Sequence, residues 1–376
     1  MGKVGLVTIL ADHLHGRASV AEVTPELVRE ANRHEVGAIV YRQTRAPELE
    51  KTFFYALAAD RKRRRLDREI REALLPKGIA LFSVKGLFVA DFYPVPALRT
   101  MGDIDYVASD RPAARKVLEG LGYEFHESEG VADWHFRKGE WEFELHDRLL
   151  YDERYGTKVQ VRTLNDCFSH YQDGAIDNDF HFLFLMAHLR KHLLEGVGFR
   201  QFFDIAVLLK NGRAAFDWGK VRRDLKKIGL LSFTETVFGL CQAWFKAEPP
   251  FAIPRLPKGF AKSAAAEIYR SGVFGAGNHL GGEGWTVRMP GSTRLGYRAT
   301  RGLRLLQRAF PPYDEMVLYP QYAFLKKRKY LLPVAWVCRF GRDLFRKDKW
   351  RKFRGDAALK KERFEERNKT LRRWGL

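Results

Sequence analysis

Two aspartates at a spacing of two, Asp103 and Asp105, have the residue type and position best suited to chemistry in this sequence. They follow Gly102 and alternate with the apolar Ile104 and Tyr106, as side chains alternate along a β-strand. Both carboxylates are therefore expected on one face, with the apolar side chains in the core. Hard oxygen ligands of this kind hold Mg²⁺ against nucleotide phosphates, where two metals clamp the attacking and leaving oxygens of an in-line displacement.

A third carboxylate comes from the stretch 140–146, which alternates polar and apolar residues and predicts a half-buried strand. Its polar face carries Glu142, Glu144 and His146. We predict that Glu144 is the third ligand, because it lies deeper in the strand and beside His146. Periodicity alone does not separate Glu144 from Glu142.

The elements that position these residues form a small mixed α/β sheet. A short buried strand at 79–84 ends in Lys85 and Gly86, a short helix follows at 87–92, and the strand with the two aspartates comes next. Ser109 or Asp110 is expected to cap a helix that stops at 120–122, and further strands are predicted at 123–127, 134–137 and 141–146. The fold class is therefore α/β (α+β), a mixed-sheet core flanked by helices.

The whole chain is predicted to divide into five segments. Thr24, Pro25 and Glu26 form a helix start signal, and the basic run 61–65 lies on a long helix that ends near Pro76. The predicted divisions are an N-terminal helical region at 1–75, the α/β core at 76–150, a helical domain at 151–250, a Pro/Gly-rich irregular segment at 251–320 and a basic helical tail at 321–376. Irregular structure is expected over 249–290, with an exposed loop at 275–284.

The composition favours an anionic partner. The formal net charge is +20 and the pI is about 9.8, which attract nucleic acid, anionic membranes or phosphate-bearing substrates. The runs at 61–65 and 222–227 are interpreted as solvated helix faces. The tail, with basic and aromatic residues interleaved between 334 and 353, is a candidate for contact with RNA or an anionic membrane, and a packed helix with a solvated outer face is the alternative.

Cysteine usage and hydropathy place the protein in the cytoplasm, with peripheral membrane association left open. Cys167, Cys241 and Cys338 lie far apart and predict neither a disulfide framework nor a zinc site. The sequence contains no run of the ~18–20 apolar residues that a membrane span requires.

A histidine pair forms a second constellation. His188 and His192 are four apart on one helix, the spacing of a zinc pair, and His181 or Asp204 could be added as further ligands. No glutamate follows His188 and no third ligand has zinc-type spacing, so contacts between the second domain and the sheet, the acceptor or the nucleotide are the favoured role.

Together these residues resemble the uncharacterised nucleotidyltransferase family, within the DNA polymerase beta-like nucleotidyltransferase superfamily. The resemblance covers roughly residues 25–245. It rests on 84–86, Arg99 with 102–105, the turn at 120–123, 144–146 and 188–204. The superfamily usually carries Gly-Ser or Gly-Gly where this chain has Lys85-Gly86, so Lys85 would meet phosphate as a point charge.

The resemblance implies roles for these residues. Asp103 and Asp105 would ligate two Mg²⁺ (or Mn²⁺) ions, and Glu144 would ligate one of them and take the proton of an acceptor hydroxyl. Lys85, Gly86, Arg99 and His146 would bind nucleotide or phosphate, with Lys85 and Arg99 stabilising the departing pyrophosphate. Contacts to an acceptor or the second domain would come from His188, His192 and Asp204.

The expected function is transfer of a nucleoside monophosphate from a nucleoside triphosphate such as ATP to an unknown, anionic acceptor, with release of pyrophosphate. Two alternatives remain open. One is a catalytically silent module that binds nucleic acid, membrane or a protein through its basic surface, in which Lys85 neutralises the aspartates. The other is a metal-dependent phosphotransferase or phosphohydrolase that uses the same carboxylates on another donor.

Overall fold

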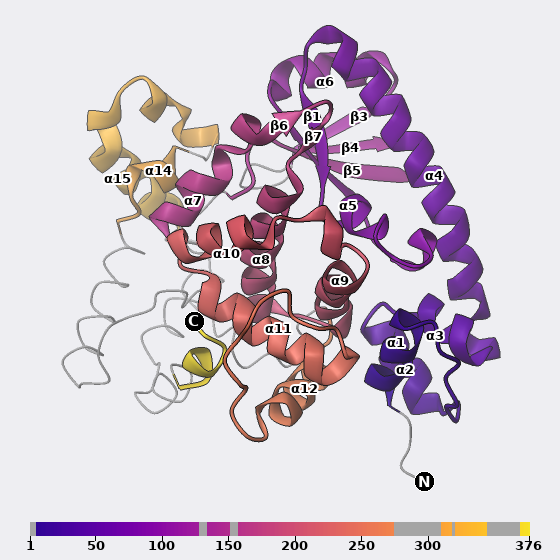
Figure 1. Cartoon of the computed structure of the whole chain (residues 1–376). Helices are drawn as coiled ribbons and strands as arrows, with labels where there is room; N and C mark the ends of the chain where they lie inside the picture. Colours follow the sequence, from indigo (N-terminus) through magenta and orange to yellow (C-terminus); the bar gives the residue numbers. More distant parts are fainter. Residues whose placement is uncertain (1–4, 128–133, 151–156, 274–309, 318–319, 344–368) are drawn as a thin grey trace.

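The computed structural model describes residues 5–127, 134–150, 157–273, 310–317, 320–343 and 369–376. The chain forms a five-stranded sheet, which Figure 1 shows at one end of the molecule, with helices over most of the rest. The strands are β1 (Leu81–Val84), β2 (Ile104–Ala108), β3 (Glu124–Glu127), β4 (Trp134–Lys138) and β5 (Trp141–His146). All five agree with the strands predicted from alternation to within two residues, and the expected α/β class is confirmed.

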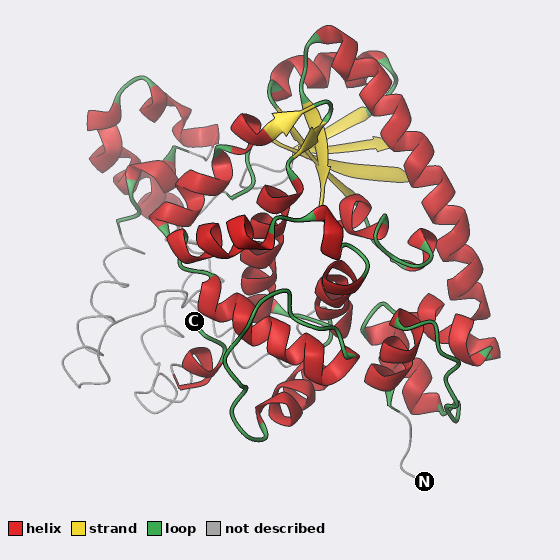
Figure 2. Cartoon of the chain, in the orientation of Figure 1, coloured by secondary structure: helices red, strands yellow, loops and turns green. Residues whose placement is uncertain are grey.

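The sheet is mixed, with strand order β1-β2-β5-β4-β3. Only the β2–β5 pair is parallel among the pairs of this sheet, and its register places Asp105 opposite Glu144. Figure 2 shows the strands gathered on one side of the long helix α4 (Glu50–Leu74). The parallel pair at the centre brings two strands of distant sequence together, and this is the pairing that assembles the acidic residues.

One face of the sheet is covered by α4 and α6 (Arg111–Gly120). Leu66, Ile70 and Leu74 of α4 and Ala114 and Leu118 of α6 share a buried cluster with the apolar side of the strands. That side consists of Ile104, Tyr106, Ala108, Phe136, Phe143 and Leu145. Because side chains alternate, the opposite face receives the polar residues, as the sequence predicts.

The N-terminal helices pack on the helical half of the molecule. They are α1 (Leu6–Leu14), α2 (Pro25–Arg33) and α3 (Gly37–Thr44), followed by the 3₁₀ turn η1 (Pro47–Leu49). Thr24 caps α2 through its side chain, with Pro25 at the first helical position, as predicted. Residues of α1–α3 share one hydrophobic cluster with the helical domain, so these two predicted segments have a common core. The division of the chain into these segments stays a prediction.

The helical domain contributes the second layer, on the polar side of the sheet. It contains α7 (Lys158–Asn165), η4 (Cys167–His170), a two-stranded ribbon of β6 (Tyr171–Gln172) and β7 (Ala175–Ile176), α8 (Asn178–Glu195), α9 (Phe199–Lys210), η5 (Arg213–Ala215), α10 (Trp218–Lys227) and α11 (Leu231–Phe245). Phe182, Phe202, Phe203 and Phe238 are fully buried in its core. The break between α8 and α9 falls at 196–198, which contains two glycines.

The short connecting elements complete the core and the C-terminal part. They are η2 (Leu75–Lys77), α5 (Gly86–Ala90), η3 (Pro96–Leu98), α12 (Phe260–Ser271), α14 (Tyr313–Met316), η6 (Pro320–Lys326), η7 (Lys329–Leu331) and α15 (Leu332–Asp343). Helix α12 lies within the stretch expected to be irregular, so that expectation is wrong for 260–271. Ala264 and Ile268 bury an apolar stripe that offsets the nearby glycines and prolines. The loop expected at 275–284 lies outside the described residues.

Candidate active site

A row of polar side chains crosses the sheet at the level of Asp105. The parallel register of β2 and β5 pairs Asp105 with Glu144, and the antiparallel register of β5 and β4 pairs Glu144 with His135. Partners in register project from the same face of a sheet. Asp105, Glu144 and His135 therefore lie side by side on the face opposite Tyr106 and Phe143.

His146 joins the two carboxylates. Its Nε2 atom lies 3.3 Å from Asp105 Oδ1 and 3.3 Å from Glu144 Oε2. Ligand atoms of Asp105, Glu144 and His146 all lie within 4.8 Å of one another. Asp105 and His146 are buried and Glu144 is half-buried, so the cluster stands at the edge of solvent. Glu142, the alternative to Glu144, is exposed and contacts His135 at 3.2 Å.

Lys85 approaches this cluster from the turn between β1 and α5. Its Nζ atom donates to Asp105 Oδ1 at 2.5 Å, and its side chain is 24% exposed. The residue adopts φ 59° and ψ −103°, a conformation that favours glycine. Its backbone N–H donates to His181 Nε2 on α8 at 3.2 Å. The hydrogen bond from the helical domain thus fixes the backbone of the turn. The ammonium group at the same time contacts Asp105 in the acidic row.

Gly86 allows the side chains of Arg99 and Met101 to approach this turn closely. A methyl group at Gly86 would meet Arg99 Nη1 and Met101 Sδ at 2.8 Å each. Both distances are shorter than a Cβ atom tolerates, so a side chain at this position would push the Arg99 and Met101 side chains away. The role of Gly86 toward nucleotide phosphate stays a prediction.

The electrostatics of the row are dominated by Lys85. Burial alone raises the pKa of Asp105, but the Lys85 charge and the hydrogen bond with His146 outweigh it and hold that pKa well below its usual range. Burial works against the Lys85 ammonium, yet Asp105 raises the pKa of Lys85 above its ordinary value. The pair is therefore charged across the whole physiological range of pH.

Asp103 lies just before β2 and is exposed. Although the residue as a whole is exposed, the surrounding protein displaces water from part of its carboxyl, and this desolvation, followed by the charges of Asp105 and Glu144, raises the pKa of Asp103. Asp103 nevertheless stands outside the cluster of atoms within 4.8 Å, whose third member is His146. The acidic site in this conformation is thus Asp105, Glu144 and His146, with Asp103 at its rim.

Arg99 is paired with Asp204 of the helical domain and not with a residue of the acidic row. Its guanidinium makes two hydrogen bonds to Asp204 on α9, Nη2 to Oδ2 at 2.8 Å and Nε to Oδ1 at 3.3 Å. The Tyr93 hydroxyl donates to Asp204 Oδ1 at 2.7 Å, and all three side chains are buried. In this conformation Arg99 and Asp204 join the core to the helical domain.

Two further arginines hold the segment before Asp103. Arg200 of α9 donates to the carbonyl oxygen of Thr100 at 2.8 Å, and Arg63 of α4 donates to that of Met101. Arg63 is buried, although the run 61–65 was expected to be a solvated face; its neighbours in the run are exposed or half-buried. The reason is visible in α4, whose buried residues Ala59, Arg63, Leu66 and Ile70 recur at helical spacing.

His188 and His192 meet on α8, with Nε2 atoms 2.8 Å apart. Burial and the Lys85 charge lower the pKa of His188 well below its usual value. Burial, with Lys191 and Lys85, lowers the pKa of His192 to about 4. Both imidazoles are therefore neutral at pH 7 and lie within the field of Lys85. Among the described residues no third ligand atom completes a metal group with them, so the zinc interpretation gains no support.

Four residues of this site, His135, His181, Arg63 and Arg200, did not receive these roles from the sequence. His135 alternates with Trp134 and Phe136 on a predicted strand, so the sequence could predict which face of the sheet it occupies. It could not predict that His135 pairs with Glu144 on the neighbouring strand. Arg63 lies at helical spacing from the buried residues of α4, so its burial could have been predicted from that periodicity. His181 and Arg200 lie about 100 residues from the groups they contact, Lys85 and Thr100, and no local pattern indicates such pairing.

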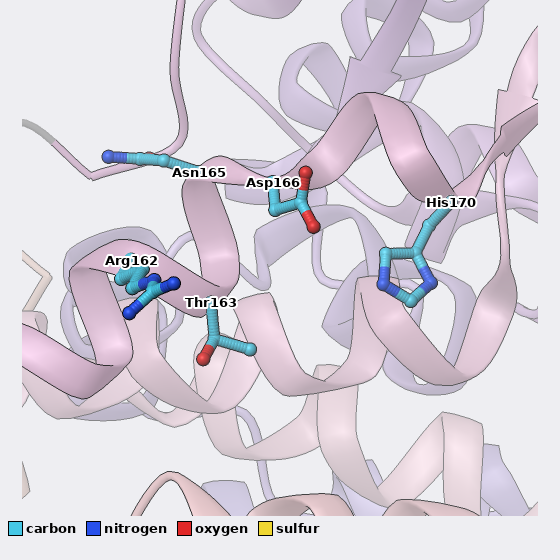
Figure 3. Close-up of a pocket in the computed structure, with 5 residues that line it drawn as sticks. All are labelled: Arg162, Thr163, Asn165, Asp166 and His170. Carbon is cyan, nitrogen blue, oxygen red and sulfur yellow. The ribbon is translucent and has the colours of Figure 1, made fainter.

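A pocket of about 580 Å³ lies elsewhere, at α7 and η4 (Figure 3). It is lined by Arg162, Thr163, Asn165, Asp166 and His170, none of which belongs to the predicted site. The Asn165 amide is already bound to the backbone of Leu150 at 2.7 and 2.8 Å. The hollow therefore adds nothing to the acidic cluster.

The donor set of the cluster fits a divalent cation. Two carboxylates and one imidazole converge there, and the Lys85 ammonium binds Asp105 as a cation would. Carboxylate oxygens suit Mg²⁺ and Mn²⁺.

One comparison with known proteins gives a match. A family model described as uncharacterised nucleotidyltransferase matches residues 17–246, more than half of the 376-residue chain. The matched range runs from before α2 through the sheet to the end of α11 and contains every residue of the site described above. No curated protein and no solved structure matches the chain.

Proposed function

The chain belongs to the uncharacterised nucleotidyltransferase family, and from this premise we propose that it transfers a nucleoside monophosphate from a nucleoside triphosphate to a hydroxyl or phosphate acceptor and releases pyrophosphate. The family assignment confirms the resemblance seen in the sequence. The observation that carries the proposal is the convergence of Asp105, Glu144 and His146 within 4.8 Å, beside a lysine.

Asp105 and Glu144 would hold Mg²⁺ or Mn²⁺, with Asp103 joining from the rim when nucleotide binds. The bound cation would neutralise phosphate charge and lower the pKa of an acceptor hydroxyl. Glu144, half-buried and free to face solvent on one side, takes the proton of that hydroxyl on a carboxylate oxygen. His146, between the two carboxylates, keeps them oriented through its Nε2 atom.

The chemical step is a displacement at the α-phosphorus. The acceptor oxygen forms a bond to that phosphorus while the bond from phosphorus to the oxygen bridging to the β-phosphate breaks, and pyrophosphate leaves with the electron pair. Lys85 exchanges its partner Asp105 for the triphosphate and stabilises the leaving charge. Such transfers depend mainly on positioning and charge neutralisation, which a rigid acidic row and a lysine on a fixed turn can supply.

The basic surface supports an anionic acceptor, such as RNA, a phosphorylated sugar or a lipid-linked glycan intermediate. The net charge of +20 raises the local concentration of any such molecule. His188 and His192, neutral and close to Lys85, stand on the helical side of the site and are proposed to contact the acceptor or the nucleotide.

One observation favours a second candidate, the catalytically silent binding module. The ion pair between Lys85 and Asp105 neutralises a metal ligand within the chain itself. A silent module would keep this pair permanently and would bind partners through its basic surface. The enzyme requires that the pair open when nucleotide and cation arrive.

The deciding experiment uses α-³²P-labelled nucleoside triphosphates, Mg²⁺ and pools of hydroxyl and phosphate acceptors. We expect a labelled acceptor and pyrophosphate from the wild type, with turnover reduced by about 10³-fold or more in Glu144→Gln. Glu142→Gln is the matched control, since Glu142 is on the same strand and exposed, and it should retain activity. Release of orthophosphate without a nucleotidylated product would instead support a phosphohydrolase, and equal activity of the two variants would contradict the proposed role of Glu144.

A further inference from the structure

Helix α15 has an apolar face turned outward. Val334 is 50% exposed, Val337 71% and Phe340 44%, and Pro333 and Cys338 are exposed as well. These residues lie on one arc of the helix, because spacings of three and four return to the same side. The charged side chain described within this helix, Arg339, is only half-exposed and lies outside that arc. A surface helix normally has the opposite pattern, with its polar face in solvent.

The orientation of α15 is fixed by a small core of its own. Ala335 is fully buried with Met316, Tyr322 and Leu325, and Trp336 packs against this group. The Trp336 indole N–H donates to the Pro311 carbonyl oxygen at 2.7 Å. The apolar arc is therefore held outward by contacts on the opposite side of the helix, within a unit that Figure 1 shows as a separate lobe.

A basic run borders the arc. Lys326, Lys327, Arg328 and Lys329 are exposed, and Tyr330, 75% exposed, follows directly. The sequence from 320 to 342 contains six lysines and arginines and no aspartate or glutamate. Cations and apolar side chains thus occur together over 320–342 with no carboxylate between them, and Asp343 follows at the end of α15.

We propose that this lobe docks on an anionic lipid bilayer, with α15 lying in the interface plane. The apolar arc enters the boundary between headgroups and acyl chains, while the lysines and arginines contact anionic headgroups and the Tyr330 ring occupies the headgroup level. Among the described residues no helix is long and apolar enough to cross a bilayer.

The chemistry of the arc favours lipid over two other occupants. Nucleic acid recognition uses aromatic and basic side chains, and the exposed valines and proline offer it nothing. A second copy of the chain would place its own cationic run near this one, and like charges at close range oppose that contact. Anionic lipid satisfies the apolar arc and the cations at once.

The test is vesicle sedimentation of the full chain with phosphatidylcholine alone and with phosphatidylcholine mixed with phosphatidylserine. Binding to the anionic vesicles is expected, weaker by about fivefold for each of Lys326 and Lys327 changed to Gln. Val334→Asp/Val337→Asp should weaken it about tenfold or more. The matched control is Val20→Asp/Val159→Asp, at valines 91% and 54% exposed on other elements, which should bind as the wild type does.

Several outcomes would overturn the proposal. These are absence of binding to anionic vesicles, unchanged binding by Val334→Asp/Val337→Asp, or a loss of dimer rather than of lipid binding in that variant by analytical ultracentrifugation. Polynucleotide binding that the valine substitutions abolish, with vesicle binding intact, would assign the arc to nucleic acid instead. Circular dichroism of each variant establishes that the helices are retained.

Discussion

At the scale of single residues, the backbone of Lys85 is as informative as its charge. Lys85→Gly and Lys85→Ala both remove the ammonium from Asp105, but only glycine adopts φ 59° and ψ −103° without strain. We expect the free energy of unfolding of Lys85→Gly to be about 1 kcal/mol higher than that of Lys85→Ala. This difference is net of the cost of glycine, which gives the unfolded chain more conformational entropy. Urea denaturation of the two variants measures the difference, and equal or reversed stabilities would contradict the strain.

Gly86 makes a second prediction at this scale. Gly86→Ala should lower the unfolding free energy by about 1–3 kcal/mol, because the methyl group would lie 2.8 Å from Arg99 Nη1 and Met101 Sδ. Gly120→Ala is the control, since a Cβ atom there meets nothing within 4 Å. Chemical denaturation of both variants compares them directly. A Gly86→Ala protein as stable as the control would show that the Arg99 and Met101 side chains can move aside without a loss of unfolding free energy.

At the scale of elements, the Arg99–Asp204 pair fastens the strand-bearing core to α9. Asp204→Asn leaves the buried Arg99 guanidinium without a counter-ion, and we expect a loss of about 3–5 kcal/mol in unfolding free energy. Asp91→Asn removes the partner of Arg64 at an exposed site, where Asp91 is 62% exposed, and should change stability by less than about 0.5 kcal/mol. Thermal and urea unfolding provide the comparison, and similar losses in both variants would contradict the structural role of Asp204.

Local sequence patterns predicted the strands but not the contacts between distant elements. Alternation of polar and apolar residues predicted β2 and β5 and the faces of Asp105 and Glu144, because that pattern is local and has a period of two. It did not predict that Asp103 would stand at the rim, since the strand begins one residue later, at Ile104. Local patterns also did not indicate that Arg99 would bind a residue 105 positions away, and its expected contact with phosphate stays a prediction. Contacts between elements depend on packing that single-sequence patterns do not encode.

At the scale of the whole molecule, buried neutral histidines predict acid sensitivity. Burial lowers the pKa of His13, with Arg42 contributing, to about 4, and it lowers the pKa of His181 to about 3 and that of His192 to about 4. Between pH 6.5 and 4 the unfolded chain binds protons at these positions and the folded chain does not. Stability should therefore fall as the pH is lowered, by about 1.4 kcal/mol per pH unit for each histidine.

Urea unfolding at fixed ionic strength from pH 7 to 5 measures this slope. A free energy of unfolding that is constant or increases on acidification would contradict the burial of these groups as neutral imidazoles. His181 also accepts the Lys85 backbone N–H, so its protonation would disturb the turn beside the acidic row as well. Acidification is thus expected to affect the stability of the fold and the geometry of the site together.

We propose that Asp105, Glu144 and His146 form the cation-dependent nucleotide site of this nucleotidyltransferase. Calorimetric titration of the full chain with each nucleoside triphosphate, with and without Mg²⁺, is the measurement to make. We expect Mg²⁺-dependent binding that Asp105→Asn abolishes and the exposed-site control Glu142→Gln retains. Absence of triphosphate binding at any Mg²⁺ concentration, or binding that Asp105→Asn leaves unchanged, would contradict it.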